Sequence, residues 1–231
     1  MTAVDILAFG PHPDDLEIGL GGTLAKHAAL GHTVGLCDLT RGEMASNGTP
    51  EERVREASEA AKVLGASWRE NLALPDRAIG SSPDHARAIA ELIRRARPKV
   101  VAVPYGQDRH PDHLAAAMLL REAIFNAKLR RYAAQGEPWQ PLRVCAYFIN
   151  DAGPTSFLVD VTAHYETKKR ALACYHSQFK RGSGAADTRL NSPQFNQLIE
   201  SRDSQFGALA GVRFAEGLFM TEPVVLESLV K

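Results

Sequence analysis

The sequence has no apolar run long enough to cross a bilayer, and its N-terminus has no basic region followed by an apolar core and a small-residue cleavage site. A membrane-spanning helix needs about 20 consecutive apolar residues, and a secretory signal needs all three of those features. We therefore expect a cytoplasmic protein that does not act as a membrane protein.

Cysteine is scarce as well. The three cysteines, Cys37, Cys145 and Cys174, are widely spaced and form no CxxC pair. An odd, scattered set of this kind excludes a disulfide framework and a cysteine-rich zinc module. We expect these residues to behave as small core hydrophobes in a reducing compartment.

The chain also has no excess of either charge, because Lys plus Arg and Asp plus Glu both number 27. Nucleic-acid surfaces are usually held by a net basic face. We therefore expect no nucleic-acid partner, and we look for a small-molecule substrate instead.

Apolar runs with strand character alternate with helical patterns along the chain, which has 231 residues and 45% hydrophobic content. The expected strands are 4–9, 33–39, 68–72, 100–103, 144–149 and 157–161, with a late pair at 212–220 and 224–226. The expected helices are 21–30, 50–64, 83–96, 111–129, 163–179 and 193–209. This alternation predicts an α/β fold in one domain spanning 1–231, with a Rossmann-like, mostly parallel sheet and helices on both faces.

Two short motifs carry the chemistry. Residues 12–15 read His-Pro-Asp-Asp directly after the first expected strand, and residues 110–113 read His-Pro-Asp-His after the run at 100–104. Loops that leave the carboxyl ends of two parallel strands face each other across the crevice where open α/β sheets bind ligands. We therefore expect the two motifs to form one site.

The residue types in these motifs suit a catalytic zinc ion, which needs three N or O ligands, an open position for water and a separate acid/base group. His12 and Asp15 are three residues apart in a tight loop, and His113 completes the ligand set from the facing loop. Asp14 is then not a metal ligand. Its carboxylate is expected to take a proton from the attacking water and deliver it to the leaving group.

The second motif has two further polar residues. A protonated His110 would stabilise the oxyanion of a tetrahedral intermediate, and Asp112 would be a carboxylate that fixes a histidine tautomer. A purely structural alternative for His110 is a cap at the start of the following helix. The first motif has a structural alternative as well. Taken without the second motif, residues 12–15 could form a turn whose carboxylates cap the following helix.

Two other classes of protein compete with the hydrolase. A dinucleotide-binding protein would use the glycines at 19–22 and Asp38 at the end of the second strand, but Leu24 stands where the third glycine of that fingerprint belongs. A sugar-binding module without catalytic activity is the other alternative, and it gives no reason for an unliganded Asp14 beside a metal. Both are disfavoured.

The two motifs, together with Gly-x-Gly-Gly-Thr at 19–23 and Leu-Pro-Asp-Arg at 74–77, resemble the PIG-L (LmbE-like) zinc N-deacetylases over nearly the whole chain. The resemblance implies removal of an acetyl group from an N-acetylglucosamine unit. It also implies one Zn²⁺ on His12, Asp15 and His113, a base at Asp14 and oxyanion stabilisation by His110. In particular, the chain is similar to the branch that deacetylates N-acetylglucosaminyl malate on the route to bacillithiol.

The same resemblance implies that Arg53 and Arg109 contact an anionic substrate tail, and that the protein is a homo-oligomer, either a trimer or a hexamer. From its sequence context alone, Arg53 also fits a solvated helix face with ion pairs along it. Some relatives place a tyrosine where residues 192–195 read Ser-Pro-Gln-Phe, and no tyrosine follows Tyr175 here. The stretch 181–191, rich in small residues, predicts a mobile loop over the site or at a subunit contact.

Overall fold

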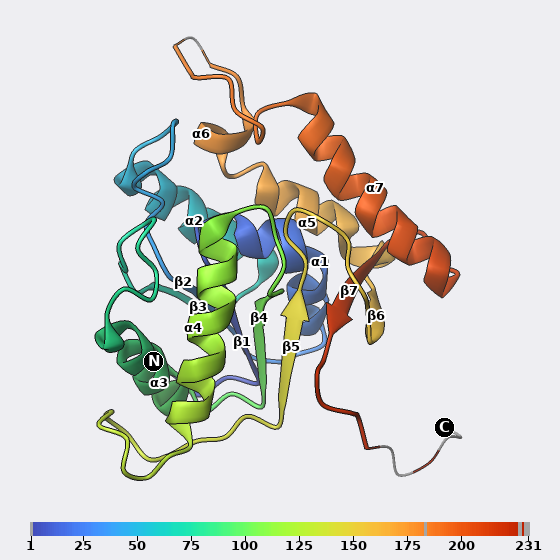
Figure 1. Ribbon diagram of the computed structural model, residues 1–231. Coiled ribbons are helices and arrows are strands. Elements are labelled where there is room, and N and C mark those ends of the chain that lie inside the picture. Colours follow the sequence, from blue (N-terminus) through green and yellow to red (C-terminus); the bar gives the residue numbers. More distant parts are fainter. Residues whose placement is uncertain (1, 183, 226–227, 229–231) are drawn as a thin grey trace.

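The computed structural model describes residues 2–182, 184–225 and 228, and Figure 1 shows a central sheet between two layers of helices. The sheet has seven strands in the order β3-β2-β1-β4-β5-β7-β6. Their bounds are β1 Ile6–Gly10, β2 Val34–Asp38, β3 Trp68–Asn71, β4 Val100–Pro104, β5 Arg143–Tyr147, β6 Phe157–Asp160 and β7 Ala215–Phe219.

The sheet is mostly parallel, as the sequence predicts. Strands β3, β2, β1, β4 and β5 pair in parallel, whereas β7 pairs antiparallel with both β5 and β6. The order reverses beside β1, because the chain moves outward through β2 and β3 and then returns to place β4 on the other side. Such a reversal opens a crevice at the carboxyl ends of β1 and β4, where both motifs begin.

Helices cover both faces of the sheet. One layer is formed by α1 (Asp15–Ala29), α2 (Pro50–Leu64), α5 (Tyr165–Leu172) and α7 (Pro193–Ala210). The other layer is formed by α3 (Pro83–Ala96) and α4 (Pro111–Ala127). Each layer buries its own apolar cluster against the sheet, which confirms the predicted α/β class. Among the described residues, no helix is long and apolar enough to cross a membrane.

For α2 and α3, whose sequences carry a capping signal, the first helical residue was predicted correctly. Helix α2 begins at Pro50 behind a capping box formed by Thr49 and Glu52. Helix α3 begins at Pro83, where the Ser82 side chain accepts a hydrogen bond from a backbone N–H. In both cases a side chain satisfies a helix N–H that has no partner within the helix, so the local sequence sets the boundary.

The expected start of the first helix at residue 21 was wrong, since α1 begins at Asp15. The glycines lie inside the helix, where they allow close packing. A Cβ on Gly19 would lie 2.4 Å from Tyr147 Cδ2, and a Cβ on Gly22 would lie 2.7 Å from Val161 Cβ. These glycines therefore serve helix packing and do not bind a dinucleotide phosphate.

Two further boundaries differ from expectation. The expected helix 163–179 is broken into a 3₁₀ turn (Thr162–His164), α5 and the short α6 (His176–Phe179). Of the expected strand 224–226, residues 224 and 225 lie in no strand, and residue 226 is outside the described residues.

The cysteines behave as expected in part, because Cys37 and Cys145 are buried and Cys174 is partly exposed.

A buried group of charges fixes α1 in place. Lys168, which has no exposed surface, donates to Asp203 Oδ2 at 2.6 Å and to Glu216 Oε1 at 2.7 Å. The Glu216 carboxylate in turn accepts the backbone N–H groups of Gly22 and Thr23, at 2.9 and 2.7 Å. Buried charges are tolerated when they are paired and hydrogen-bonded in this way. The result is a rigid attachment for the helix whose N-terminus carries the first motif.

Candidate active site

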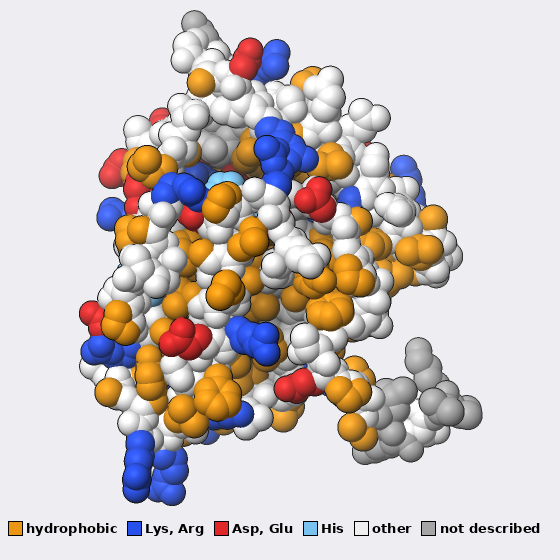
Figure 2. Space-filling model, in the orientation of Figure 1, with side chains coloured by type: hydrophobic (Ala, Val, Ile, Leu, Met, Phe, Trp, Pro, Cys, Tyr) orange, Lys and Arg blue, Asp and Glu red, His pale blue; other side chains and the backbone are white. Residues whose placement is uncertain are grey.

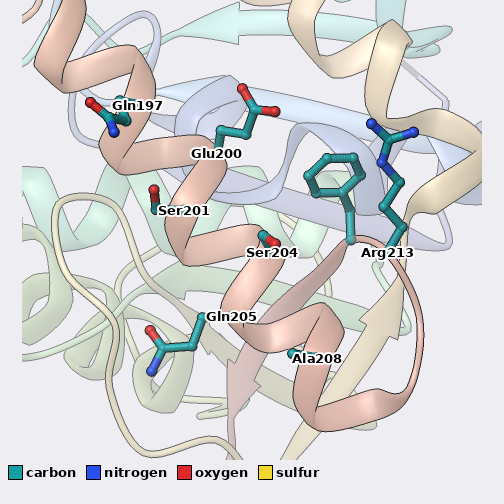
Figure 3. Close-up of a pocket in the computed structure, with 8 residues that line it drawn as sticks. Gln197, Glu200, Ser201, Ser204, Gln205, Ala208 and Arg213 are labelled. Atoms are coloured by element: carbon teal, nitrogen blue, oxygen red, sulfur yellow. The ribbon is translucent and has the colours of Figure 1, made fainter.

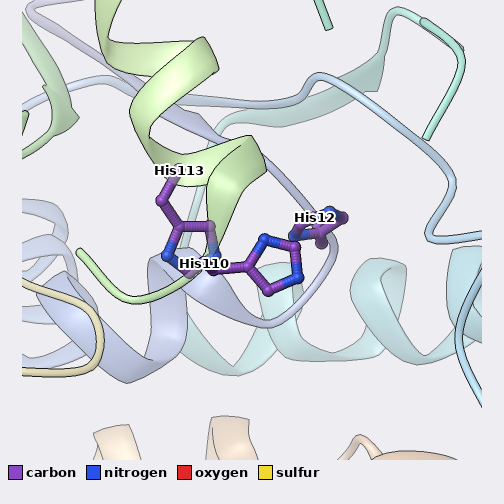
Figure 4. A group of neighbouring side chains, drawn as sticks. All are labelled: His12, His110 and His113. Atoms are coloured by element: carbon purple, nitrogen blue, oxygen red, sulfur yellow. The ribbon is translucent and has the colours of Figure 1, made fainter. Parts of the chain in front are cut away.

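The two motifs meet at the carboxyl ends of β1 and β4, which are neighbours in the sheet. Figure 4 shows the three imidazoles side by side, with His110 and His113 at the first turn of α4 and His12 on the loop after β1. The ring centroids of His110 and His113 are 4.7 Å apart, and those of His12 and His110 are 4.9 Å apart. The structure thus brings together the two motifs that the sequence singled out.

Asp15 lies between two of these rings. Its Oδ2 is 3.1 Å from His12 Nδ1, and its Oδ1 is 3.4 Å from His113 Nε2. All three side chains are buried. Two imidazole nitrogens and a carboxylate that face one another out of water match the donor set of a divalent metal site. A ligand atom from each of His12, His110 and His113 also falls within one metal-sized group, so the cluster can hold a metal ion.

The charge balance of this cluster also favours a cation. Burial alone would lower the pKa of His113, but Asp15 and Asp108 outweigh it and raise that pKa to about 9. Burial likewise opposes charge on His12, but hydrogen bonds to Asp112, Asp15 and Asp76 raise the His12 pKa well above its usual value. The carboxylates therefore stabilise positive charge at the two rings, and a metal ion held there would supply that charge in place of the protons.

Asp108, which the sequence reasoning missed, supports His113 from behind. Its Oδ1 lies 3.0 Å from His113 Nδ1 and accepts the backbone N–H of His110 at 2.8 Å. Asn150 donates to the same oxygen from the loop after β5, at 2.9 Å. Carboxylates commonly orient metal-ligating histidines in this way. Only the position of Asp108, two residues before His110, offered a signal in the sequence.

Asp112 was expected to fix a histidine tautomer, and the structure places it beside His12. Its Oδ2 is 3.4 Å from His12 Nε2, and its Oδ1 accepts a hydrogen bond from Arg77 at 2.8 Å. Asp76 Oδ1 lies 3.3 Å from the same His12 nitrogen. The second ring nitrogen of His12 therefore faces two carboxylates, on the side away from Asp15.

The Asp14 carboxylate contacts Arg53, unlike Asp15, which contacts the histidines. The Asp14 backbone has a φ of 112°, and its side chain makes no capping hydrogen bond although it stands at the N-cap of α1. The simple capping alternative is therefore wrong for this residue. Burial raises the Asp14 pKa to about 7, even though Arg53 acts in the opposite direction. A carboxylate with a pKa near neutrality is suited to accept and return a proton, and strained backbone of this kind is typical of functional sites.

Arg53 does not lie on a solvated helix face, and that alternative was wrong. It is 4% exposed, and its Nη2 lies 3.1 Å from Asp14 Oδ2. The guanidinium also donates to the carbonyl oxygens of Pro13 and Gly42. The i,i+4 pattern of the helix suggested solvent exposure, and it could not show that the start of α2 packs against the first motif. Arg109, by contrast, is exposed beside His110.

His110 takes the helix-capping role that the sequence offered as an alternative. Its Nδ1 accepts the backbone N–H of Asp112 at 3.2 Å, so it does cap α4. That bond places the ring proton on Nε2, which remains available as a donor. Burial, together with His12 and His113, lowers the His110 pKa, which favours the neutral ring.

The loop 181–191 is tied to the segment that follows β2. The side chain of Asn47 donates to Ala186 O at 2.9 Å and accepts from Ala186 N at 2.8 Å. Phe195 is buried on α7, so the side chain at that position belongs to the core. The Tyr175 hydroxyl is buried and has no hydrogen-bond partner among the described residues.

A hollow away from the motif residues runs along α7, with a volume of about 630 Å³. Figure 3 shows that its walls are mainly polar side chains of that helix, among them Gln197, Glu200 and Ser204. It contains none of the candidate catalytic residues, and the motif site therefore remains the place where chemistry is expected.

An α/β sheet with a buried His/Asp donor set and a separate buried carboxylate at its strand ends defines a metal-dependent amide hydrolase. Comparison with known proteins gives the family. The family model PIG-L, described as GlcNAc-PI de-N-acetylase, matches residues 7–124, and the chain belongs to this family. The predicted family and enzyme class are thus confirmed.

Named relatives agree with this assignment. The chain is 28% identical to the diacetylchitobiose deacetylase of Thermococcus kodakarensis, over 92% of this chain and 81% of the relative. It is 34% identical to a 1D-myo-inositol 2-acetamido-2-deoxy-alpha-D-glucopyranoside deacetylase of Saccharopolyspora erythraea, over 75% and 83% of the two chains. The crystal structure of a conserved protein from Thermus thermophilus superposes with a TM-score of 0.89, at 38% identity over 99% of both chains.

Proposed function

We propose that this enzyme is a zinc-dependent deacetylase that removes the N-acetyl group of N-acetylglucosaminyl malate, a step of bacillithiol biosynthesis. The observation that carries the hydrolytic mechanism is the environment of Asp14, whose buried carboxylate follows the first strand next to the proposed ligand Asp15, pairs with Arg53 and makes no capping hydrogen bond to α1. Binding alone would give no use for such a group, whereas hydrolysis needs it as a base.

Each residue of the site has a proposed role. His12, Asp15 and His113 would hold the zinc ion. When bound, zinc lowers the pKa of a coordinated water and polarises the acyl oxygen. Asp14 takes the proton of the attacking water and returns it to the leaving amine, and Arg53 holds the Asp14 carboxylate in place.

His110 lies in the same cluster of rings, and its Nε2–H is the donor that remains once Nδ1 accepts the capping bond. A hydrogen bond from this group to the oxyanion of the tetrahedral intermediate would stabilise charge that develops only during the reaction. The neutral form of the ring suffices for this donation. The proton that passes through Asp14 is therefore kept separate from the proton that His110 donates.

The sugar part of the proposed substrate is supported by the relatives, whose names describe deacetylases of a diacetylchitobiose and of a 2-acetamido-2-deoxy-glucopyranoside. The malate part is supported by Arg109, an exposed arginine next to His110. Arginine binds carboxylates through a two-point fork. Arg53 is a poorer candidate for this contact, because Asp14 and two carbonyl groups already occupy its terminal nitrogens.

We expect kcat/KM for N-acetylglucosaminyl malate to exceed that for N-acetylglucosamine by about 10² or more, since a charge-assisted hydrogen bond contributes about 1.5–3 kcal/mol. Arg109→Ala should remove most of this difference and leave the activity on N-acetylglucosamine unchanged. An amine-release assay on both substrates measures it. Arg130→Ala is the matched control, because Arg130 is exposed beyond the opposite end of α4.

Equal turnover of both substrates by the wild type would remove the malate assignment. The enzyme would then be a deacetylase of another small molecule that contains N-acetylglucosamine. If the zinc-loaded protein released no amine from any N-acetylglucosaminide, the deacetylation of amino sugars itself would be refuted.

The proposed homo-oligomer, a trimer or hexamer, is supported by an exposed apolar face on α4. Met118 is 76% exposed and Phe125 is 56% exposed, and Figure 2 shows orange side chains gathered over this helix. Apolar patches of this kind mark protein contacts. We expect the double variant Met118→Glu, Phe125→Glu to sediment as a smaller species than the wild type, and an unchanged mass would exclude this face from the interface.

A further inference from the structure

The loop after β3 carries the Leu-Pro-Asp-Arg motif at 74–77, which the proposed mechanism does not use. We propose that Asp76 is a positioning residue: together with Asp112 it holds the His12 ring so that Nδ1 faces Asp15 and Nε2 carries the proton. This inference rests on the proposed function to the extent that His12 is a metal ligand.

The two nitrogens of the His12 ring face different carboxylates. Nδ1 lies 3.1 Å from Asp15 Oδ2, on the side of the donor set. Nε2 lies 3.3 Å from Asp76 Oδ1 and 3.4 Å from Asp112 Oδ2, on the opposite side. A proton on Nε2 is attracted by both carboxylates, which leaves the lone pair of Nδ1 for the metal.

The loop that presents Asp76 is shaped for this position. The Asn71 side chain accepts the N–H of Ala73 at 2.8 Å and donates to Thr40 O at 2.6 Å, which anchors the start of the loop. Ala73 and Arg77, on either side of Asp76, have φ values of 50° and 66°. Backbone in this left-handed region is costly for residues other than glycine and is retained mainly where function requires it.

Other groups of the protein also hydrogen-bond to the two carboxylates. Asp76 Oδ2 accepts the N–H of Met44 at 2.9 Å. Asp112 accepts both the backbone N–H and the guanidinium of Arg77, each at 2.8 Å. The Arg77 guanidinium pairs with Asp112, and both carboxylates keep an oxygen toward His12 Nε2, for which they can serve as acceptors.

Another arrangement of the same residues gives a competing interpretation, because His12, Asp76 and Asp112 also fall within one metal-sized group. A second metal would compete with the Nε2 proton for the same two carboxylates. The number of zinc ions bound per chain therefore separates the two interpretations. One ion is expected from the positioning role, and two ions would indicate a second site.

The test compares the wild type with Asp76→Ala and Asp76→Asn, with Asp84→Asn as the control, because Asp84 is an exposed carboxylate on α3. Zinc affinity is measured by competition with a chelator, and the His12 Nε2 proton is followed by NMR of ¹⁵N-histidine-labelled, zinc-loaded protein. We expect Asp76→Ala to weaken zinc binding about 10- to 100-fold, the usual effect of losing a residue that orients a ligand. The Nε2 proton should then exchange faster with water.

Asp76→Asn keeps an acceptor oxygen and should show a smaller loss, and the control should match the wild type. Thermal unfolding of each protein separates local from global effects. Wild-type zinc affinity and an unchanged Nε2 signal in Asp76→Ala would overturn the positioning role. So would two zinc ions per wild-type chain with one lost in the variant. A wild type that binds no zinc would instead refute the proposed function.

Discussion

Replacement of His113 by alanine is expected to abolish zinc binding and deacetylation together. His113 Nε2 is one of the donor atoms that face Asp15, the residue is 3% exposed, and alanine has no ligand atom to take its place. A metal ion contributes several kcal/mol of stabilisation to a hydrolytic transition state. A loss of about 4 kcal/mol corresponds to about 10³-fold in kcat/KM.

Zinc content by elemental analysis and amine release from an N-acetylglucosaminide give the two readouts. His12→Ala should behave in the same way, because it removes the facing donor. His32→Ala is the control, since His32 is exposed before β2, at the end of the strand opposite the motif loop. Stoichiometric zinc in purified His113→Ala would show that the ligand set has been misassigned.

Much of this fold is readable from the sequence because its strongest signals are local. The buried parallel strands are near-continuous apolar runs, and Thr49 and Ser82 cap their helices through bonds that span two or three residues. Wherever local signals were ambiguous, tertiary contacts decided the outcome. The glycines of α1 resembled a helix start, but their role depends on Tyr147 and Val161, which are more than 100 residues away in the chain.

The site was predictable to a similar degree. The motifs brought His12, Asp15, His110 and His113 together as expected, because both follow parallel strands that are neighbours in the sheet. Of the supporting carboxylates, Asp112 was predicted, whereas Asp108 and Asp76 were not. Asp76 reaches His12 from a loop more than 60 residues later in the chain, by way of a backbone conformation that no composition rule predicts.

Arg53 shows the same limit most clearly. Its neighbours along α2 are charged, so its sequence context indicates a solvated surface, yet the helix turns this one residue toward Asp14. A periodic pattern identifies the buried face of a helix only when that face is apolar. Arg53 stands at the N-terminal end of a buried face whose other members are Ala57, Ala60, Ala61 and Leu64, so an apolar pattern leaves this cation out, and its partner is revealed only by the fold.

The second large effect is expected for Asp14→Asn, which should retain zinc and substrate affinity while kcat falls by about 10² or more, the usual contribution of a general base. Asparagine is the right replacement because Asp14 has a φ of 112°, and asparagine tolerates positive φ better than alanine does. It also keeps an oxygen that can accept the hydrogen bond from Arg53. What is lost is the ability to carry a proton between water and amine.

Asp15→Asn provides the informative comparison, because the two aspartates are adjacent in sequence and buried to a similar degree. If the roles are as proposed, Asp15→Asn loses zinc and activity together, whereas Asp14→Asn loses kcat and keeps its zinc. Rates are normalised to folded, zinc-loaded protein, since a neutral residue at position 14 leaves the buried Arg53 without its counter-ion. If Asp14→Asn retained wild-type kcat, the base would have to be another residue, and the proposed proton path through Asp14 would be excluded.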